Sequence, residues 1–217
     1  MSTSIDNSLR ALRRETLDIV QIHNATVPVL QDGSMLACLE KAREQGKVRH
    51  IGASVYGEEA ALAALETGKI EVLQIAVSLL DQRMRYRVIP KAKEMGVGIL
   101  TRSALLKGAL TEKARWLPRD LEELTAASQR AQISLGASWQ TLPALALRFC
   151  VSLDGVHSVL SGIRTRAELR DCVRALEDGP LAPELLERAN SLALDDERLL
   201  NPTNWKLEEI DTNIAQL

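Results

Sequence analysis

One junction recurs three times in the first half of the chain: a predicted helix ends at a glycine, and an apolar run begins within two residues. The glycines are Gly46, Gly68 and Gly96, and each suits the left-handed C-cap of a helix. The runs that follow are continuously apolar rather than alternating, which is typical of parallel strands covered by helices. Strands and helices that alternate in this way predict an α/β fold with right-handed crossovers.

This pattern predicts five strands, at residues 17–23, 48–54, 72–78, 97–103 and 156–161. Helices are predicted at residues 34–43, 58–66, 88–94, 118–124, 138–147 and 166–176, and a last helix is expected to open at Pro183. No linker interrupts the pattern. We therefore expect a single domain over residues 1–217, with an irregular tail from about residue 201.

The composition favours no nucleic-acid or membrane partner. The net charge is −2 and the basic residues are dispersed. No apolar run reaches the roughly 18 residues that span a membrane, and no signal pattern opens the chain. Three scattered cysteines fit reduced thiols, so we expect a cytoplasmic protein. No metal-ligand spacing, P-loop or GxGxxG motif is present, and a metal site is not expected.

Polar residues stand at the expected carboxyl ends of the strands, where β/α barrels gather their chemistry. Among three histidines, His23 is the one in such a position. Imidazole titrates near neutrality, so His23 can donate a hydrogen bond or exchange a proton. A purely structural role, in which His23 orders the loop at Asn24, stays open. The other polar strand ends are Ser54, Ser78, Arg102–Ser103 and Ser161–Gly162.

Several segments, in order, resemble the aldo-keto reductase family. Asp18–His23 resembles the strand that ends in the family's active-site histidine, and residues 46–54 resemble its G-K-[VI]-R-x-I-G-x-S segment. Gln74 with the following Leu79-Leu80, and the segments 102–108 and 161–169, resemble later cofactor-side segments. The resemblance covers about residues 8 to 178. It implies an incomplete (β/α) TIM-type barrel with about five parallel strands, the fourth to eighth of the family.

The resemblance also implies cofactor contacts. Ser54 and Gln74 would hold a nicotinamide carboxamide, and Ser103 and Leu105 would lie along a pyrophosphate. In the loop at the adenosine end, forked arginine donors suit a 2′-phosphate, which favours NADP over NAD. The residues of that loop are Gly162, Arg164 and Arg166.

Three departures from the family pattern weaken this expectation. Val55 stands where the family often has asparagine, and Cys172 where asparagine approaches the adenine. Arg102 replaces the aromatic residue that is commonly stacked on the nicotinamide, although some branches carry an arginine there. We therefore expect NADP binding to be possible, but weakened or lost.

The family's catalytic tyrosine, lysine and aspartate would precede residue 8, which leaves His23 as the surviving member of that set. The leading hypothesis is a non-redox proton transfer on a small molecule (isomerisation, dehydration or cyclisation) by His23 with Arg102. One alternative is an NADP-dependent carbonyl oxidoreductase whose acid comes from another chain or from Tyr56. A non-catalytic binding or regulatory protein is the other.

Five parallel strands do not close at the eight-strand geometry, so the first and last strands are expected to be open edges. Unpaired edges invite pairing with another chain. Because two-fold assemblies are the commonest, we predict a homodimer built over these edges.

Overall fold

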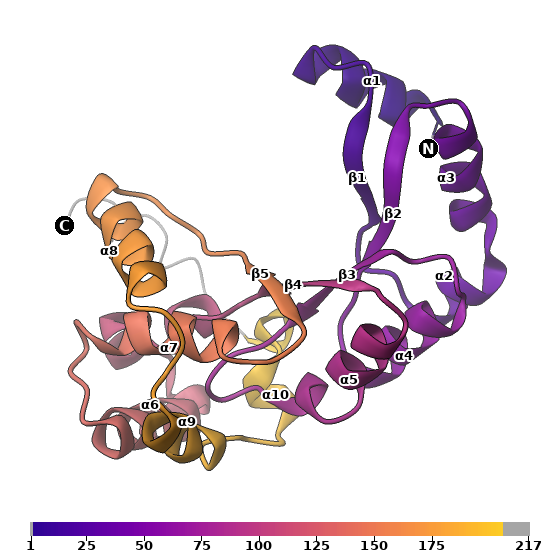
Figure 1. Cartoon of the computed structure of the whole chain (residues 1–217). Coiled ribbons are helices and arrows are strands. Elements are labelled where there is room, and N and C mark those ends of the chain that lie inside the picture. The colour runs from indigo at the N-terminus through magenta and orange to yellow at the C-terminus, as the bar shows by residue number, and fades with distance from the viewer. Residues whose placement is uncertain (1, 206–217) are drawn as a thin grey trace. The chain divides into compact units, whose positions relative to one another are not determined.

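The computed structural model describes residues 2–205. Its five strands form one parallel sheet in the order β1-β2-β3-β4-β5 (Figure 1). They are β1 (Leu17–Ile22), β2 (Val48–Ser54), β3 (Val72–Ala76), β4 (Gly98–Arg102) and β5 (Val156–Val159). The predicted α/β class and the five parallel strands are confirmed.

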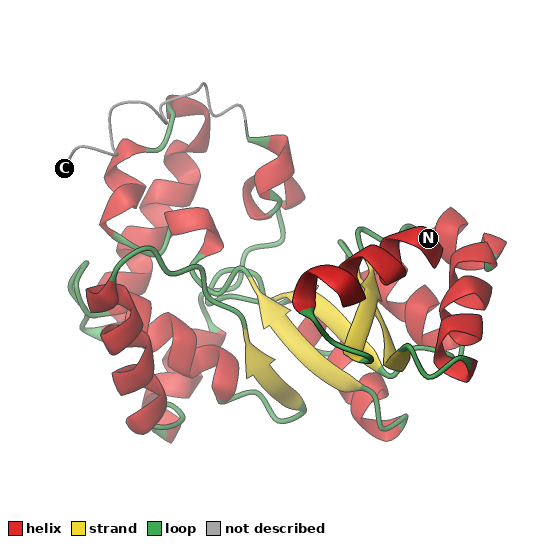
Figure 2. Ribbon diagram, turned by 90° about the horizontal axis from the view of Figure 1, so that it is seen from above, coloured by secondary structure: helices red, strands yellow, loops and turns green. Residues whose placement is uncertain are grey.

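The helices alternate with the strands. They are α1 (Ser2–Leu12), α2 (Val27–Asp32), α3 (Ser34–Glu44), α4 (Glu58–Glu66), α5 (Val88–Glu94), α6 (Glu122–Leu135), α7 (Leu142–Val151), α8 (Arg166–Glu177), α9 (Pro183–Asn190) and α10 (Glu197–Leu200). Helix α1 precedes β1, and more than one helix follows β1, β4 and β5. Among the described residues, segments 103–152 and 161–205 contain helices and loops without strands (Figure 2).

Side chains of the central strands differ in burial between the two faces of the sheet. Leu73, Ile75 and Ile99 are fully buried, and helices α3, α4 and α5 pack on β2, β3 and β4 respectively. The alternate residues, such as Gln74 and Leu100, are half-buried. Successive residues of a strand point to opposite faces, so one face is covered by helices and the other is less covered.

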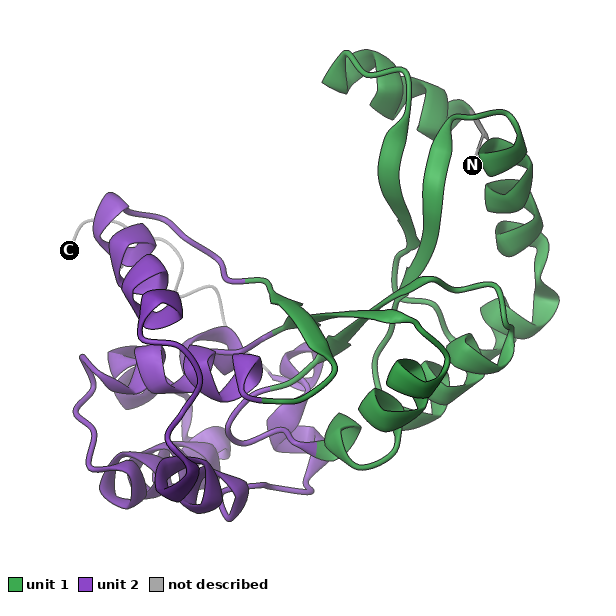
Figure 3. Cartoon of the chain, in the orientation of Figure 1, with its two compact units in different colours: residues 1–77, 83–102, 153–160 green, residues 78–82, 103–152, 161–217 purple. Residues whose placement is uncertain are grey.

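The described chain divides into two compact units (Figure 3). Unit 1 holds the sheet and helices α1 to α5, and comprises residues 1–77, 83–102 and 153–160. Unit 2 holds helices α6 to α10 and comprises residues 78–82, 103–152 and 161–217. Inside unit 2, the buried Gln82 amide donates to the carbonyl oxygens of Leu79 and Ala189, both at 2.8 Å. A single domain over residues 1–217 stays a prediction.

The predicted strands 17–23, 72–78, 97–103 and 156–161 run one or two residues too far at their carboxyl ends. They end at Ile22, Ala76, Arg102 and Val159. The backbone gives the reason at β4, since Ser103 has a left-handed φ of 63°, which a strand cannot contain. At β1, the left-handed Asn24 (φ 50°) directly follows His23. Of the polar residues expected at these strand ends, Arg102 is the last residue of β4, and His23, Ser78, Ser103 and Ser161 lie in the loops that follow.

Two predicted helices have wrong bounds. The helix expected at 118–124 is a 3-10 turn at Arg119–Leu121 followed by α6, which continues to a left-handed cap at Gly136. The helix expected at 138–147 begins later, at α7, with a proline in its first turn. Helices α1 and α2 were not predicted at all. Of the irregular tail, Pro202–Asn204 forms a 3-10 turn, and residues 206–217 lie outside the described residues.

No helix in the described part of the chain is long and apolar enough to cross a membrane. Within the same residues, no group of three or more histidine, cysteine or carboxylate side chains could hold a metal ion. The first and last strands of the sheet are β1 and β5, so the two predicted edges are in place.

Candidate functional site

Unit 1 gathers five of the predicted residues near the carboxyl ends of its strands. We call His23, Ser54, Tyr56, Gln74 and Arg102 the strand-end set. The strand register aligns Ile22 with Ala53, Ser54 with Gln74, and Ala76 with Arg102, so adjacent strands finish at similar levels. Backbone hydrogen bonds continue beyond the strand ends. The Ala25 N–H donates to the Ser54 oxygen at 2.9 Å, and the Val55 N–H donates to the Gln74 oxygen at 3.1 Å.

His23 is the first residue beyond β1, and its side chain is exposed. The left-handed turn at Asn24 ends the strand direction here, and Ala25 returns into the core at 2% exposure. A non-glycine residue with positive φ carries a modest conformational cost and often marks a functional loop. His23 thus directly follows the carboxyl end of β1, and its catalytic role stays a prediction.

Arg102 and Tyr56 form a stacked pair that the sequence did not predict. The guanidinium carbon of Arg102 lies 3.8 Å from the centre of the Tyr56 ring, and its Nη2 donates to the Val55 oxygen at 3.0 Å. Such a cation–π contact contributes about 0.5–1 kcal/mol at an exposed site. The tyrosine remains 36% exposed, so one side of the pair faces solvent.

Ser54 and Gln74 lie next to each other on paired strands. Directly aligned residues of a parallel pair point to the same face, so the two side chains share the less covered face of the sheet. Ser54 is buried at 4% exposure and Gln74 is half-buried. A hydroxyl and an amide together can donate and accept hydrogen bonds, as a carboxamide ligand requires.

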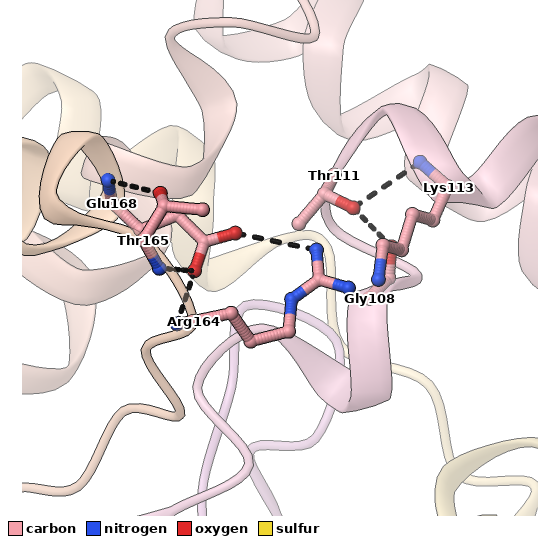
Figure 4. Close-up of polar contacts among 6 residues, drawn as sticks. All are labelled: Gly108, Thr111, Lys113, Arg164, Thr165 and Glu168. Atoms are coloured by element: carbon pink, nitrogen blue, oxygen red, sulfur yellow. Dashed lines mark hydrogen bonds and ion pairs between the residues drawn. The ribbon is translucent and has the colours of Figure 1, made fainter. Parts of the chain in front are cut away.

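In unit 2, the loop after β4 holds Ser103 and Leu105. Ser103, Leu106 and Lys107 have φ values of 63°, 43° and 50°, so three of the five non-glycine residues with positive φ in the described part of the chain fall in this loop. The loop then turns at Gly108, where the Thr111 hydroxyl donates to the Gly108 oxygen at 2.7 Å and accepts from the Lys113 N–H at 3.2 Å (Figure 4). Left-handed residues next to right-handed ones can turn successive N–H groups toward an anion.

The loop before α8, also in unit 2, holds Gly162 and Arg164, and Arg166 is the first residue of α8. All three residues are exposed. Arg164 is engaged with Glu168: its backbone N–H donates to the carboxylate at 2.6 Å and its Nη2 at 3.3 Å (Figure 4). Part of the charge predicted to meet a phosphate is therefore compensated within the protein. The Cys172 thiol lies 3.8 Å from the Ser161 hydroxyl and ties the same loop to α8.

A capping box begins α8. The Thr165 hydroxyl accepts from the Glu168 N–H at 3.1 Å, and the Glu168 carboxylate accepts from the Thr165 N–H at 3.4 Å. The hydrogen bond from the Arg164 N–H lowers the pKa of Glu168 below its ordinary 4.5, burial opposes this, and the Arg164 guanidinium and the Thr165 N–H lower it further.

We expect the Glu168→Gln variant to be less stable than the wild type at neutral pH, by about 0.5–1 kcal/mol of unfolding free energy. Because the pKa of Glu168 is lower in the folded state, its contribution is present above 4.5 and lost as the pH falls through the folded value. Urea unfolding at pH 7 and at pH 3 measures this. A difference between the two proteins that is as large at pH 3 as at pH 7 would contradict it.

The aldo/keto reductase family model matches residues 1–193, most of the chain. The chain belongs to the aldo/keto reductase family. Solved structures agree on the fold: an aldo-keto reductase from Bacillus halodurans in its holo form superposes with a TM-score of 0.75 at 24% identity, over 91% of this chain and 68% of that one. The glycerol dehydrogenase from Gluconobacter oxydans superposes at 0.64 and 20% identity, over 88% and 62%. The incomplete barrel predicted from the sequence is thus consistent with aldo/keto reductase barrels.

Two curated proteins of this family are similar in sequence. The NADH-specific methylglyoxal reductase of Escherichia coli (strain K12) is 26% identical over 185 residues, and covers 78% of this chain. The L-galactose dehydrogenase of Arabidopsis thaliana is 25% identical over 183 residues, and covers 81%. This aldo/keto reductase chain spans 57% of the length of each.

Proposed function

We propose that this chain binds a nicotinamide dinucleotide and exchanges hydride with a small carbonyl or hydroxyl compound. The observation that carries the proposal is the strand-end set, which places an imidazole, a hydroxyl, an amide and a guanidinium on four adjacent parallel strands or directly after them. The names of the two curated relatives, a reductase and a dehydrogenase, support redox chemistry over the non-redox reaction favoured by the sequence.

The described residues fit such a cofactor in each unit taken by itself. In unit 1, Ser54 and Gln74 match the hydrogen-bonding pattern of a carboxamide, and the Arg102–Tyr56 stack offers a flat surface to a planar ring. In unit 2, the resemblance assigns the pyrophosphate to Ser103 and Leu105, in the loop whose Leu106 and Gly108 N–H groups donate to the oxygens of these two residues. When bound, the cofactor supplies the hydride.

The protein's own part in the reaction is to position and protonate. His23 would donate a hydrogen bond to the carbonyl oxygen of the substrate and pass its proton to the alkoxide that forms. Arg102 holds a fixed positive charge at the same edge of the sheet, which favours the developing negative charge. Tyr56 is a second proton source, if its hydroxyl reaches the substrate.

A non-redox proton transfer is the second candidate, and Arg102 favours it. Arg102 stands at the position where the family commonly has an aromatic residue against the nicotinamide. Its guanidinium lies over the Tyr56 ring. A fixed cation at the carboxyl end of the same sheet could stabilise an enolate during isomerisation or dehydration without any hydride. This alternative predicts turnover that does not need a nicotinamide cofactor.

Oxidation of NADPH or NADH in the presence of methylglyoxal, followed by absorbance, tests the redox proposal. We expect turnover, with NADPH favoured because Arg166 is exposed and can meet a 2′-phosphate.

Arg166→Ala should raise the KM for NADPH by about tenfold, as loss of a charged hydrogen bond does, and leave the KM for NADH unchanged. An NADH preference, like that in the name of the E. coli relative, would overturn the cofactor assignment. No turnover with methylglyoxal, or with NADP and L-galactose or glycerol, would overturn the redox proposal.

A further inference from the structure

Helix α8 leaves an apolar stripe uncovered. Leu169, Val173 and Leu176 follow one another at helical spacing and are 49%, 45% and 59% exposed. A different side of the helix is packed: Ala175 is buried at 1% exposure, and α8 lies against α7 within unit 2. Amphipathic helices normally bury their apolar stripe, so this one is a candidate contact surface.

The charges beside the stripe favour a particular partner. Arg170 and Glu177 are exposed, seven residues apart, and each directly follows a leucine of the stripe. If two copies of α8 lie antiparallel and cross at Val173, Leu169 of one copy meets Leu176 of the other. Arg170 of each copy then faces Glu177 of the other copy, which gives two pairs of opposite charge beside the apolar contact. A parallel pair would instead place like charges opposite each other.

The predicted edge-to-edge dimer has less in its favour. The edge strand β1 carries Asp18, which is ion-paired with Arg49 at 2.8 Å and with Arg14 at 3.6 Å. All three side chains are more than half exposed. Charged side chains on an edge strand oppose pairing with another strand.

We propose that α8 is the contact surface of a weak homodimer, in which two copies of the helix pack antiparallel about a two-fold axis at Val173. The occupant is a second copy of this chain, because its own charges complement the stripe in this one register. A single helix pair is smaller than a standard interface of about 1,600 Å², so the dimer should dissociate readily on dilution. This surface is independent of the strand-end set and of the proposed reaction.

Charge reversal tests the register, with self-association measured by sedimentation velocity over a range of concentrations. R170E places two carboxylates opposite each other, and E177R places two guanidinium groups opposite each other. Each single variant should therefore weaken dimerisation by about tenfold or more, since a pair of favourable contacts becomes repulsive. The double variant R170E/E177R should restore it. Arg130→Glu, an exposed reversal on α6 of the same unit, serves as the matched control and should leave it unchanged.

Mixing the two single variants gives an independent test. The introduced glutamate of R170E would face the introduced arginine of E177R, and the unchanged Glu177 of the first would face the unchanged Arg170 of the second. The mixture should therefore form a heterodimer with wild-type affinity. Circular dichroism checks that each variant keeps its helices. The proposal would be overturned by a wild-type chain that is monomeric at every concentration. It would also be overturned if neither single charge reversal weakened dimerisation. A monomer would also be the outcome if another protein covers the stripe.

Discussion

Replacing His23 by asparagine is expected to slow the proposed carbonyl reduction by about 10²- to 10⁴-fold, the usual loss when a positioned proton donor is removed. Asparagine can still donate a hydrogen bond, but it cannot exchange a proton near neutral pH. The affinity for NADPH should change less than about twofold, because the resemblance assigns the carboxamide contacts to Ser54 and Gln74. Steady-state rates and cofactor titrations on the same preparation measure both quantities.

His50→Asn is the matched control for this experiment. His50 is also exposed on the same sheet, but it lies in the first half of β2, where its Nδ1 is 3.2 Å from Glu71. We expect this variant to keep the wild-type rate. If His23→Asn retains full activity, or if both histidine variants lose it equally, His23 is not the proton donor.

Gly52→Ala is expected to destabilise the folded chain by about 1–3 kcal/mol, the usual range for overpacking a core. A Cβ at Gly52 would lie 2.7 Å from the backbone oxygen of Val72 and 2.9 Å from Cγ of Gln21. The backbone of the adjacent strand cannot move away without disturbing the β2–β3 pairing that aligns Ser54 with Gln74. Denaturant unfolding and the affinity for NADPH should therefore both be affected.

Gly98→Ala provides the control in the same sheet. A Cβ at Gly98 would meet the oxygen of Glu71 at 3.6 Å, an ordinary contact, and its φ is not positive. We expect a change in unfolding free energy near zero, or a small gain from the lower backbone entropy of the unfolded alanine chain. If both substitutions destabilise the chain equally, the short distance from Gly52 to the Val72 backbone is not the reason why position 52 requires glycine.

Strands and most helices could be predicted because their signals are local. The glycine caps and the continuous apolar runs located all five strands, and the register of the sheet then brought the strand ends together. Helices α1 and α2 were missed, although α2 has Pro28 in its first turn and the left-handed Gly33 directly after its last residue. Each buries only one residue among those with described side chains, Ile5 and Leu30, so both contribute little to the core.

The contacts of the candidate site were less accessible to sequence reasoning. Arg102 and Tyr56 are 46 residues apart and belong to segments that are not adjacent in the sheet, so no periodicity connects them. The contact of Thr165 with Glu168 had a signal, because a threonine followed three residues later by glutamate predicts a capping box. The left-handed backbone at Leu106 and Lys107 had none, since neither residue type favours it.

Equilibrium binding of NADPH to the chain and to its Gln74→Leu variant tests the central claim most directly. The claim is that the strand-end set of unit 1 holds the nicotinamide end of the cofactor. We predict saturable binding by the wild type, seen as a change in NADPH fluorescence. For Gln74→Leu we predict a dissociation constant raised by about tenfold, because the carboxamide loses its hydrogen-bonding partner. Absence of binding by the wild type, or equal affinity of the two proteins, would contradict the account.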